Sequence, residues 1–410
     1  MKKITVSGGI PLRGTVAVSG SKNAALPILF ATLVTGGISR LSGVPDIGDV
    51  DCAIRILECY GAHIRRDGGI LTVDTRDVSY ATPPDSLISS IRASTYLIGA
   101  GLARFGRADV RPFGGCAFSH RPIDIHLDAC RDLGATVDGD RILCDRLHGG
   151  SICLRLPSVG ATVNALLMSV AAAGESTIHG YAREPHIDDL IRFLRAAGAS
   201  ITVTPDAISV KPAPLRGARH HLVGDMIEAG SYLVAAVATG GSVSLSDPPA
   251  DSLAAITSAI SSTGAKIKKS RYGLSATAEG RLHPSNILAT PYPGFPTDLA
   301  PIMTPLFSLS GGSVTDSVWP SRFGYLDALS HFGLRYRLTD NRAEIFPSRL
   351  TPARVSAPDL RGGMACVIAA LMADGRSEIY SAEHILRGYE NLTEKLTSLG
   401  AHIEITDAEA

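Results

Sequence analysis

The sequence lacks the features that would place it in several common functional classes. Its seven cysteines are odd in number and form no CxxC pair, which argues against a disulfide framework and a zinc site. No GxxxxGK[ST] and no strand-linked GxGxxG occurs, so the familiar nucleotide triphosphate and nicotinamide enzymes are disfavoured. Lys plus Arg and Asp plus Glu each total 39, and this balance creates no overall basic field for nucleic acid.

Long apolar runs are also absent. The longest, such as residues 165–173 and 366–373, are too short to cross a bilayer, and the start MKKITVSGG has no apolar segment of a secretory signal. We therefore predict a cytoplasmic protein with no membrane or nucleic-acid partner, no metal and no cofactor, while the oligomeric state stays open. A length of 410 residues favours two domains.

A repeat runs through the whole chain. A leucine-rich helix end, a glycine, a small or apolar residue and an alternating strand recur at intervals of 64 to 73 residues. The glycines are Gly61, Gly134, Gly198, Gly264, Gly333 and Gly400. Each copy follows an apolar helix, so we predict six small α/β modules, three per domain. The polar segment 212–225 divides them, and the first strand is expected to pair with the C-terminal half. The predicted domains are 22–224, and 1–21 plus 225–410.

The stretch of residues 111–130 concentrates reactive residue types. Gly114 and Gly115 stand directly before Cys116, and glycine lets a ligand approach the backbone closely. Arg121 follows within five residues, and a thiol among cationic groups is partly ionised and reactive. The alternative is a structural cysteine in a glycine turn. The glycine pair and the nearby cation favour a functional thiol.

Cations stand near the predicted starts of several apolar helices. A cation at a helix N-terminus joins the backbone amides in holding an anion, which suggests a polyanionic substrate. These residues are Lys22 with Asn23 beside it, Arg92, Arg361 and Arg387. Alone, Lys22 would be interpreted as a surface lysine. Asp298 opens another helix, either as its cap or as a carboxylate opposite Cys116, and Arg322 after the single tryptophan is a further candidate cation.

Motifs of a known family run from residue 4 to beyond residue 390. They are SGSKNAALPIL, IRAS, GGCAFSHRPIDIHL, SVGATV, AREP, GFPTDL, the RF of WPSRF, DLR and RGYE. On these motifs the chain resembles the enolpyruvyl transferases, most closely those that act on UDP-N-acetylglucosamine. The resemblance implies two inside-out α/β barrel domains of three repeated modules each, with the active site in the interdomain cleft. It implies transfer of the enolpyruvyl group from phosphoenolpyruvate to a hydroxyl of a uridine nucleotide, with release of phosphate.

The resemblance also implies roles for residues at matching positions. Cys116 would protonate the enol methylene and would be the target of fosfomycin, while Asp298 would accept the proton of the acceptor hydroxyl. Phosphoenolpyruvate would be bound by Lys22, Arg92, Arg121 and Arg387. The uridine would lie against Arg121, Pro122, Asp124 and Leu127, and the acceptor phosphates against Ser158, Val159 and Gly160. We expect Asn23, Arg322 and Arg361 to contact substrate as well.

Several positions depart from the family's pattern. Met226 and Leu156 stand where arginine and lysine are usual, and Pro320 and Leu386 replace usual charged residues. These changes lie largely on the acceptor side, so the acceptor stays open. One candidate is UDP-N-acetylglucosamine, as in the first step of peptidoglycan synthesis, and another is UMP, as in nucleoside-antibiotic synthesis. A third alternative is a paralogue that binds its ligand without catalysis. Relatives that use shikimate phosphate lack the loop cysteine.

Overall fold

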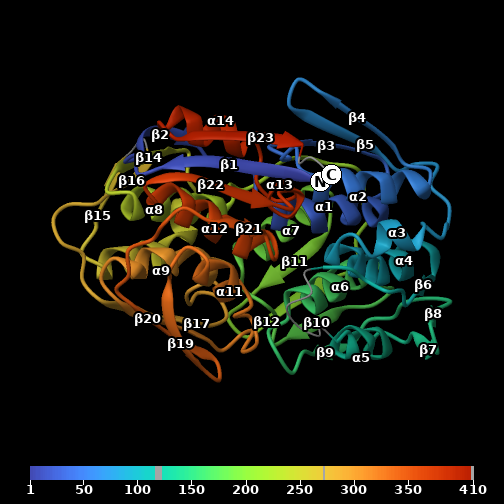
Figure 1. Ribbon diagram of the computed structural model, residues 1–410. Coiled ribbons are helices and arrows are strands. Elements are labelled where there is room, and N and C mark those ends of the chain that lie inside the picture. Colours follow the sequence, from blue (N-terminus) through green and yellow to red (C-terminus); the bar gives the residue numbers. More distant parts are fainter. Residues whose placement is uncertain (116–121, 271–272, 408–410) are drawn as a thin grey trace. The chain divides into compact units, whose positions relative to one another are not determined.

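The computed structural model describes residues 1–115, 122–270 and 273–407 (Figure 1). The chain forms two compact units. In their described parts, the N-terminal unit comprises residues 20–115 and 122–223, and the C-terminal unit comprises residues 1–19 and 224–407. The backbone therefore passes from one unit to the other between Ser19 and Gly20 and again between Val223 and Gly224.

The described part of the N-terminal unit contains three sheets. Their strand orders are β13-β3-β5-β4, β6-β8-β7 and β11-β12-β10-β9. The strands are β3 Ile38–Ser42, β4 His63–Asp67, β5 Ile70–Asp74, β6 Arg107–Asp109, β7 Thr136–Asp138, β8 Arg141–Leu143, β9 Ser151–Cys153, β10 Ser176–His179, β11 Ser200–Val203, β12 Ala207–Lys211 and β13 Arg219–His221.

The described part of the C-terminal unit also contains three sheets. Their strand orders are β21-β22-β1-β23, β15-β16-β14-β2 and β17-β18-β20-β19. The strands are β1 Lys2–Gly8, β2 Arg13–Ala17, β14 Ser242–Ser246, β15 Lys266–Ser270, β16 Gly273–Thr277, β17 Ser285–Ala289, β18 Gly312–Asp316, β19 Arg335–Thr339, β20 Arg342–Phe346, β21 Arg354–Ser356, β22 Gly375–Tyr380 and β23 His402–Asp407.

Five of these six sheets share one plan, which is the structural form of the repeat. In the first sheet, β4 and β5 form an antiparallel hairpin, β5 pairs antiparallel with β3, and β13 adds to β3 in parallel. In the sheet β21-β22-β1-β23, β1 occupies the position that β5 has in the first sheet, and it pairs antiparallel with β22 and β23. The N-terminal strand thus completes the final repeat, and its predicted pairing with the C-terminal half is observed.

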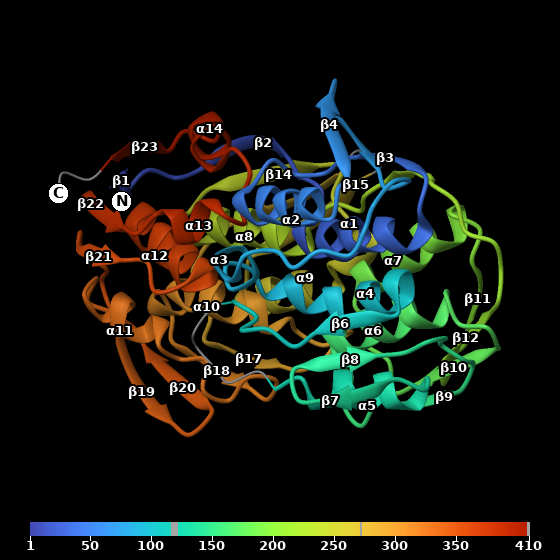
Figure 2. The same ribbon diagram turned by 90° about the vertical axis from the view of Figure 1, so that its right-hand side faces the viewer.

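The helices fall into two kinds. Those that begin each module are mostly apolar and largely buried, as helices inside a core are: α1 Lys22–Thr35, α4 Leu97–Phe105, α6 Val159–Ser169, α8 Met226–Ala238, the short α10 Ala300–Met303 and α12 Leu360–Met372. The second helices bury one face: α2 Gly48–Cys59, α5 Asp124–Asp132, α7 Pro185–Ala196, α9 Ala254–Ser262, α11 Tyr325–Ser330 and α14 Leu392–Ser398. Figure 2 shows several of them against their sheets, for example α5 beside β7.

The remaining short elements connect the modules. They are α3 Asp85–Ile88, α13 Glu383–Leu386 and the 3₁₀ helices η1 Arg92–Tyr96, η2 Ala250–Ser252, η3 Thr297–Leu299 and η4 Pro305–Ser308. Each unit has its own hydrophobic core, built around α1, α4 and α6 in one and around α8 and α12 in the other. The predicted α/β class with three modules per half is therefore confirmed.

The six repeat glycines explain why the repeat is legible in the sequence. Each ends a second helix with a positive φ, a conformation that glycine adopts without the penalty of a side chain. The φ values are 90° at Gly61, 91° at Gly134, 109° at Gly198, 92° at Gly264, 87° at Gly333 and 93° at Gly400. The same backbone requirement therefore recurs six times, and with it the same residue.

Two kinds of feature are absent from the described residues. None of their helices combines the length and hydropathy that a bilayer crossing requires. No group of three or more His, Cys, Asp or Glu side chains among them is placed to hold a metal ion.

Candidate active site

In the N-terminal unit, Lys22 is held by a carboxylate from the next helix. Helix α1 begins at Lys22, as the sequence predicts. The Nζ atom of Lys22 lies 3.1 Å from Oδ2 of Asp49, which is in the first turn of α2. Both side chains are largely buried, at 14% and 6% exposed, so water screens their attraction little. Asn23 is half-buried beside Lys22. The sequence analysis did not single out Asp49.

Arg92 opens η1 and lies against the segment that leads to the predicted catalytic loop. A Cβ on Gly115 would come within 3.0 Å of Cβ of Arg92, and a Cβ on Gly114 within 1.8 Å of the Ser89 carbonyl oxygen. Gly115 also has a φ of 125°, so the backbone here requires glycine at both positions. Cys116 and Arg121 lie outside the described residues, and their predicted roles stay predictions.

Helices α5 and α6 carry the residues predicted for the acceptor. Their faces are joined by a buried hydrogen bond of 2.7 Å between Nδ2 of Asn164 and Nδ1 of His126. A Cβ on Gly160 would lie 2.7 Å from Cε1 of His126, so the two helices approach closely. Asp124 begins α5, with Pro122 before it exposed and Leu127 one turn later half-buried. The structure thus groups these residues at neighbouring helix starts.

Ser158 caps α6, with its Oγ accepting a hydrogen bond of 3.3 Å from the Ala161 amide. Val159 and Gly160 follow in the first turn, where the amides and the helix dipole favour an anion. The side chain of Ser158 is therefore occupied within the helix, and the group best placed for a phosphate is the first turn as a whole.

Arg155 is an unpredicted cation at the same place. Its guanidinium is ion-paired with Asp124 and, at 2.8 Å, with Oδ2 of Asp128 one turn further along α5. All three side chains are about half exposed. The neighbouring Leu156 is 61% exposed, so no apolar core requires a leucine there. The cation near the start of α6 is therefore Arg155, one residue before position 156, and it is paired with two carboxylates.

In the C-terminal unit, Asp298 lies between two arginines that are distant in the sequence. Its Oδ1 accepts from Nη1 of Arg322 at 2.7 Å, and its Oδ2 lies 3.0 Å from both Nε and Nη2 of Arg361. The arginine side chains are 4% and 3% exposed, and that of Asp298 is 31% exposed. Asp298 is therefore an accessible carboxylate whose two oxygens are bound by two buried arginines. The alternative of a simple helix cap does not describe these contacts.

The same cluster contains two of the three predicted cations of this unit, Arg322 and Arg361. Burial alone would lower the pKa of Arg361, but the neighbouring Asp298, Tyr389 and Asp225 outweigh burial and raise it. Arg361 is thus a fixed positive charge at the start of α12. Arg387, at the end of α13, is half-buried.

A second buried network surrounds Glu228 on α8. Lys395 donates from Nζ to Oε1 of Glu228 at 2.6 Å, and the Ser19 amide donates to Oε2 at 2.7 Å. Burial raises the pKa of Glu228 to about 7, although Lys395 opposes the shift. Asp225 caps the same helix through the amides of the residues that follow Met226. This network fixes the chain at Ser19, next to the passage between the units.

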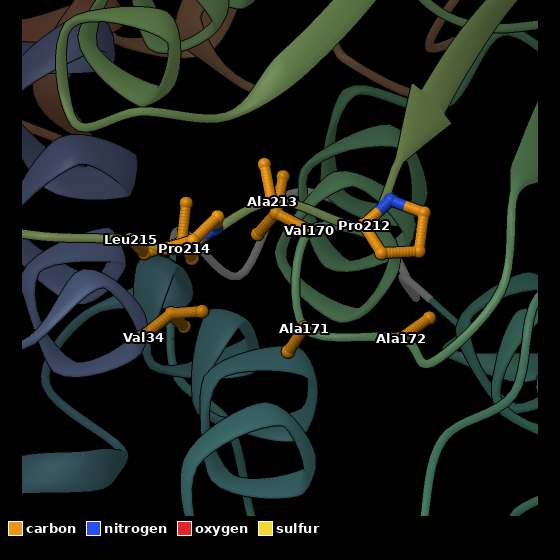
Figure 3. Close-up of a pocket in the computed structure, with 8 residues that line it drawn as sticks. All are labelled: Val34, Val170, Ala171, Ala172, Pro212, Ala213, Pro214 and Leu215. Carbon is orange, nitrogen blue, oxygen red and sulfur yellow. The ribbon is translucent and has the colours of Figure 1, made fainter.

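A pocket of about 480 Å³ opens at the opposite end of α1 from Lys22 (Figure 3). Val34 and residues 170–172 and 212–215 line it, and every one of these side chains is apolar. Binding of phosphoenolpyruvate needs cations for a carboxylate and a phosphate. This pocket is therefore not the predicted substrate site.

Comparison with known proteins assigns the family. A family model described as EPSP synthase (3-phosphoshikimate 1-carboxyvinyltransferase) matches residues 6–396. The UDP-N-acetylglucosamine 1-carboxyvinyltransferase of Chlorobium phaeovibrioides is 39% identical over 98% of both chains, and that of Halothermothrix orenii is 38% identical over 98% of this chain and 99% of its own. The chain belongs to this family of enolpyruvyl transferases, as its motifs predict.

Solved structures agree with this assignment. The enolpyruvyl transferase NikO from Streptomyces tendae matches with a TM-score of 0.89 and 26% identity, covering 100% of this chain and 99% of that one. EPSP synthase from Acinetobacter baumannii matches with a TM-score of 0.74 and 17% identity, covering 99% and 100%, and at that identity it shows a likeness of fold.

Proposed function

We propose that the chain transfers the enolpyruvyl group from phosphoenolpyruvate to a hydroxyl of a uridine nucleotide and releases phosphate, with UDP-N-acetylglucosamine as the first candidate acceptor. The observation that carries this proposal is the 39% identity with a UDP-N-acetylglucosamine 1-carboxyvinyltransferase across 98% of both chains. That reaction would place the protein in peptidoglycan synthesis.

The chemistry requires a base, an acid and several cations. The acceptor oxygen bonds to C2 of phosphoenolpyruvate as C3 gains a proton, which gives a tetrahedral adduct. Loss of a proton from C3 and of phosphate from C2 then restores the double bond. A base must take the hydroxyl proton, an acid must supply the C3 proton, and cations must neutralise the carboxylate and phosphate.

We assign these tasks to the residues that carry the right groups. Asp298 is the base, since its carboxylate is accessible and held from behind by Arg322 and Arg361. Cys116 is the acid, on its motif alone. The cations for phosphoenolpyruvate are Lys22, Arg92, Arg121 and Arg387, with Asn23 beside the first.

On the acceptor side, we assign the uracil and ribose to the start of α5 and the phosphates to the start of α6. Asp124 and Leu127, with Pro122 before them, offer the polar and apolar contacts that a nucleoside needs. At the start of α6, which Ser158 caps, the amides of Val159 and Gly160 are offered to a phosphate, while the Ser158 amide donates to the Leu156 carbonyl at 2.7 Å.

A second candidate acceptor is UMP, and the geometry around Arg155 favours it. Leu156 supplies no charge, and the guanidinium beside it is already paired with Asp124 and Asp128. Each charged hydrogen bond that a diphosphate fails to make costs roughly 1.5–3 kcal/mol, which is about a tenfold to hundredfold loss of affinity. A single phosphate needs fewer such partners and therefore loses less.

The test is phosphate release from phosphoenolpyruvate with UDP-N-acetylglucosamine or with UMP, together with calorimetric titration of each acceptor. Turnover with the UDP-sugar supports the first candidate, and turnover with UMP alone supports the second. Binding of either nucleotide without phosphate release would support the non-catalytic paralogue and would overturn the proposal.

A matched pair of variants checks the assignment of the base. Asp298→Asn keeps the shape of the side chain but does not accept the proton, so we expect it to bind acceptor and to lose about 10²–10⁴-fold in rate. Asp327→Asn makes the same change on an exposed residue of α11 and serves as the control.

A further inference from the structure

Asp316 is a buried carboxylate whose two oxygens serve different parts of the C-terminal unit. It ends β18 and is 2% exposed. Its Oδ1 accepts hydrogen bonds of 2.9 and 2.8 Å from the amides of the second and third residues that follow it, which closes the turn leading to Arg322. Its Oδ2 accepts from the Thr297 hydroxyl at 2.5 Å. One carboxylate thus ties the turn that carries Arg322 to the helical turn that carries Asp298.

The hydroxyl of Thr297 lies between Asp316 and Arg322. Its single proton is donated to Asp316, so its lone pairs are left to accept from Nη1 of Arg322 at 3.3 Å. The same Nη1 donates to Oδ1 of Asp298 at 2.7 Å. Hydrogen-bond donation therefore runs from Arg322 through Thr297 to Asp316.

Arg322 in turn decides how the carboxylate of Asp298 is oriented. Arg361 contacts Oδ2, and Arg322 contacts Oδ1. The last torsion of an aspartate side chain is broad, so the side chain itself does not fix the carboxylate plane. With both guanidinium groups in place the plane is fixed. Displacement of Arg322 removes the contact that holds Oδ1 and so weakens the preference for this orientation.

We propose that Asp316 and Thr297 are positioning residues for the transfer reaction, because they hold Arg322 where it orients the Asp298 carboxylate toward the acceptor hydroxyl. This inference rests on the proposed role of Asp298 as the base. Neither residue touches the reacting atoms, so both act through the rate of the chemical step and leave the binding of either substrate unchanged.

Substitution of the hydroxyl provides the first test, measured as phosphate release from phosphoenolpyruvate with whichever of UDP-N-acetylglucosamine and UMP the native protein turns over. Thr297→Val keeps the side-chain shape but offers Arg322 no acceptor. We expect kcat to fall about tenfold to hundredfold, the range in which small misplacements of a catalytic group lie, with KM for both substrates unchanged. Thr297→Ser restores the hydroxyl and should restore most of the rate.

Reversal of the hydrogen-bond direction provides the second test. In Asp316→Asn the amide oxygen keeps the two backbone hydrogen bonds, so the amide nitrogen faces Thr297 and donates to it. The Thr297 hydroxyl proton must then point toward Nη1 of Arg322, so that two hydrogen-bond donors face each other. We expect a similar fall in kcat, and no further fall when Asp316→Asn is combined with Thr297→Val, because both act on one contact. Asp327→Asn is again the matched control.

The outcomes separate this inference from the proposed function. A folded Thr297→Val or Asp316→Asn protein with native kcat would overturn the positioning role, provided that Asp298→Asn is inactive. If Asp298→Asn is fully active, the assignment of the base itself fails. Equal melting temperatures of variant and native protein show folding. Should Thr297→Val not fold, Asp316→Asn decides alone, since it preserves the turn. A rise in KM without a fall in kcat would also contradict the inference.

Discussion

His126 should make the N-terminal unit sensitive to acid. The orientation of the Asn164 amide is fixed, since its Oδ1 accepts from the Gly99 amide and its Nδ2 donates to the Thr95 carbonyl. Nδ2 therefore also donates to Nδ1 of His126, which must be unprotonated. Burial, and after it the Arg92 guanidinium, lowers the pKa of His126 to about 4. Protonation would place two donors face to face in the joint between α5 and α6.

The size of the effect follows from linkage between proton binding and folding. In the unfolded chain His126 titrates near its usual pKa of 6.5, so below that pH the unfolded chain binds a proton that the folded chain refuses. The contribution of neutral His126 is fully present above pH 6.5 and is lost as the pH falls toward 4. Between pH 8 and pH 5 the loss is about 2 kcal/mol.

The measurement compares the native protein with His126→Gln in urea unfolding at pH 8, 6 and 5. Glutamine retains an acceptor for Asn164 and does not titrate, so the native protein should lose about 2 kcal/mol relative to the variant between pH 8 and pH 5. The change His331→Gln on an exposed side chain is the control. Parallel stability curves for native and His126→Gln proteins would refute the reasoning.

Three further predictions concern the other unit, the loop and the acceptor. Glu228 should act in the opposite sense: with its pKa raised from 4.5 to about 7, the native protein should gain about 2–3 kcal/mol relative to Glu228→Gln as the pH falls from 8 to 5, and urea titrations that show no gain would contradict this. Cys116→Ser should lose most turnover and its fosfomycin adduct, and Cys116→Asp should keep activity while resisting fosfomycin; mass spectrometry that finds an adduct on another cysteine would remove Cys116 from its role. Leu156→Lys should tighten binding of UDP-N-acetylglucosamine more than of UMP in calorimetry, and equal changes would place position 156 away from the acceptor phosphates.

The features that could be predicted from the sequence are those that repeat or that are local. The positive-φ glycine after each second helix recurs at Gly61 and its five counterparts because the backbone demands it each time. The start of α1 at Lys22 is also local, since it depends on residues within one helical turn. Such signals survive in a single sequence because neighbouring residues carry them.

The partners of the functional side chains could not be predicted in this way. Asp298 meets Arg322 and Arg361 across 24 and 63 positions. The sequence does not single out Arg155, because this residue stands outside the family's motifs. Only the neighbouring Leu156 departs from a residue that the family's pattern specifies. Only the fold brings Arg155 onto α5, 31 positions from Asp124. Pairings of this kind depend on packing between modules and leave no periodic trace.

These pairings change how the predicted cations should work. A sequence rich in cations at helix starts suggests open positive charge for a polyanion, but Lys22 is paired with Asp49, and Arg361 with Asp298. Removing such a carboxylate would take one partner from a buried cation, so the carboxylates also hold the cations in place. Under the proposed function, an anionic substrate would meet charges that are fixed in direction and partly neutralised. Specificity would then depend on where each cation's remaining hydrogen-bond donors are directed, more than on how many cations there are.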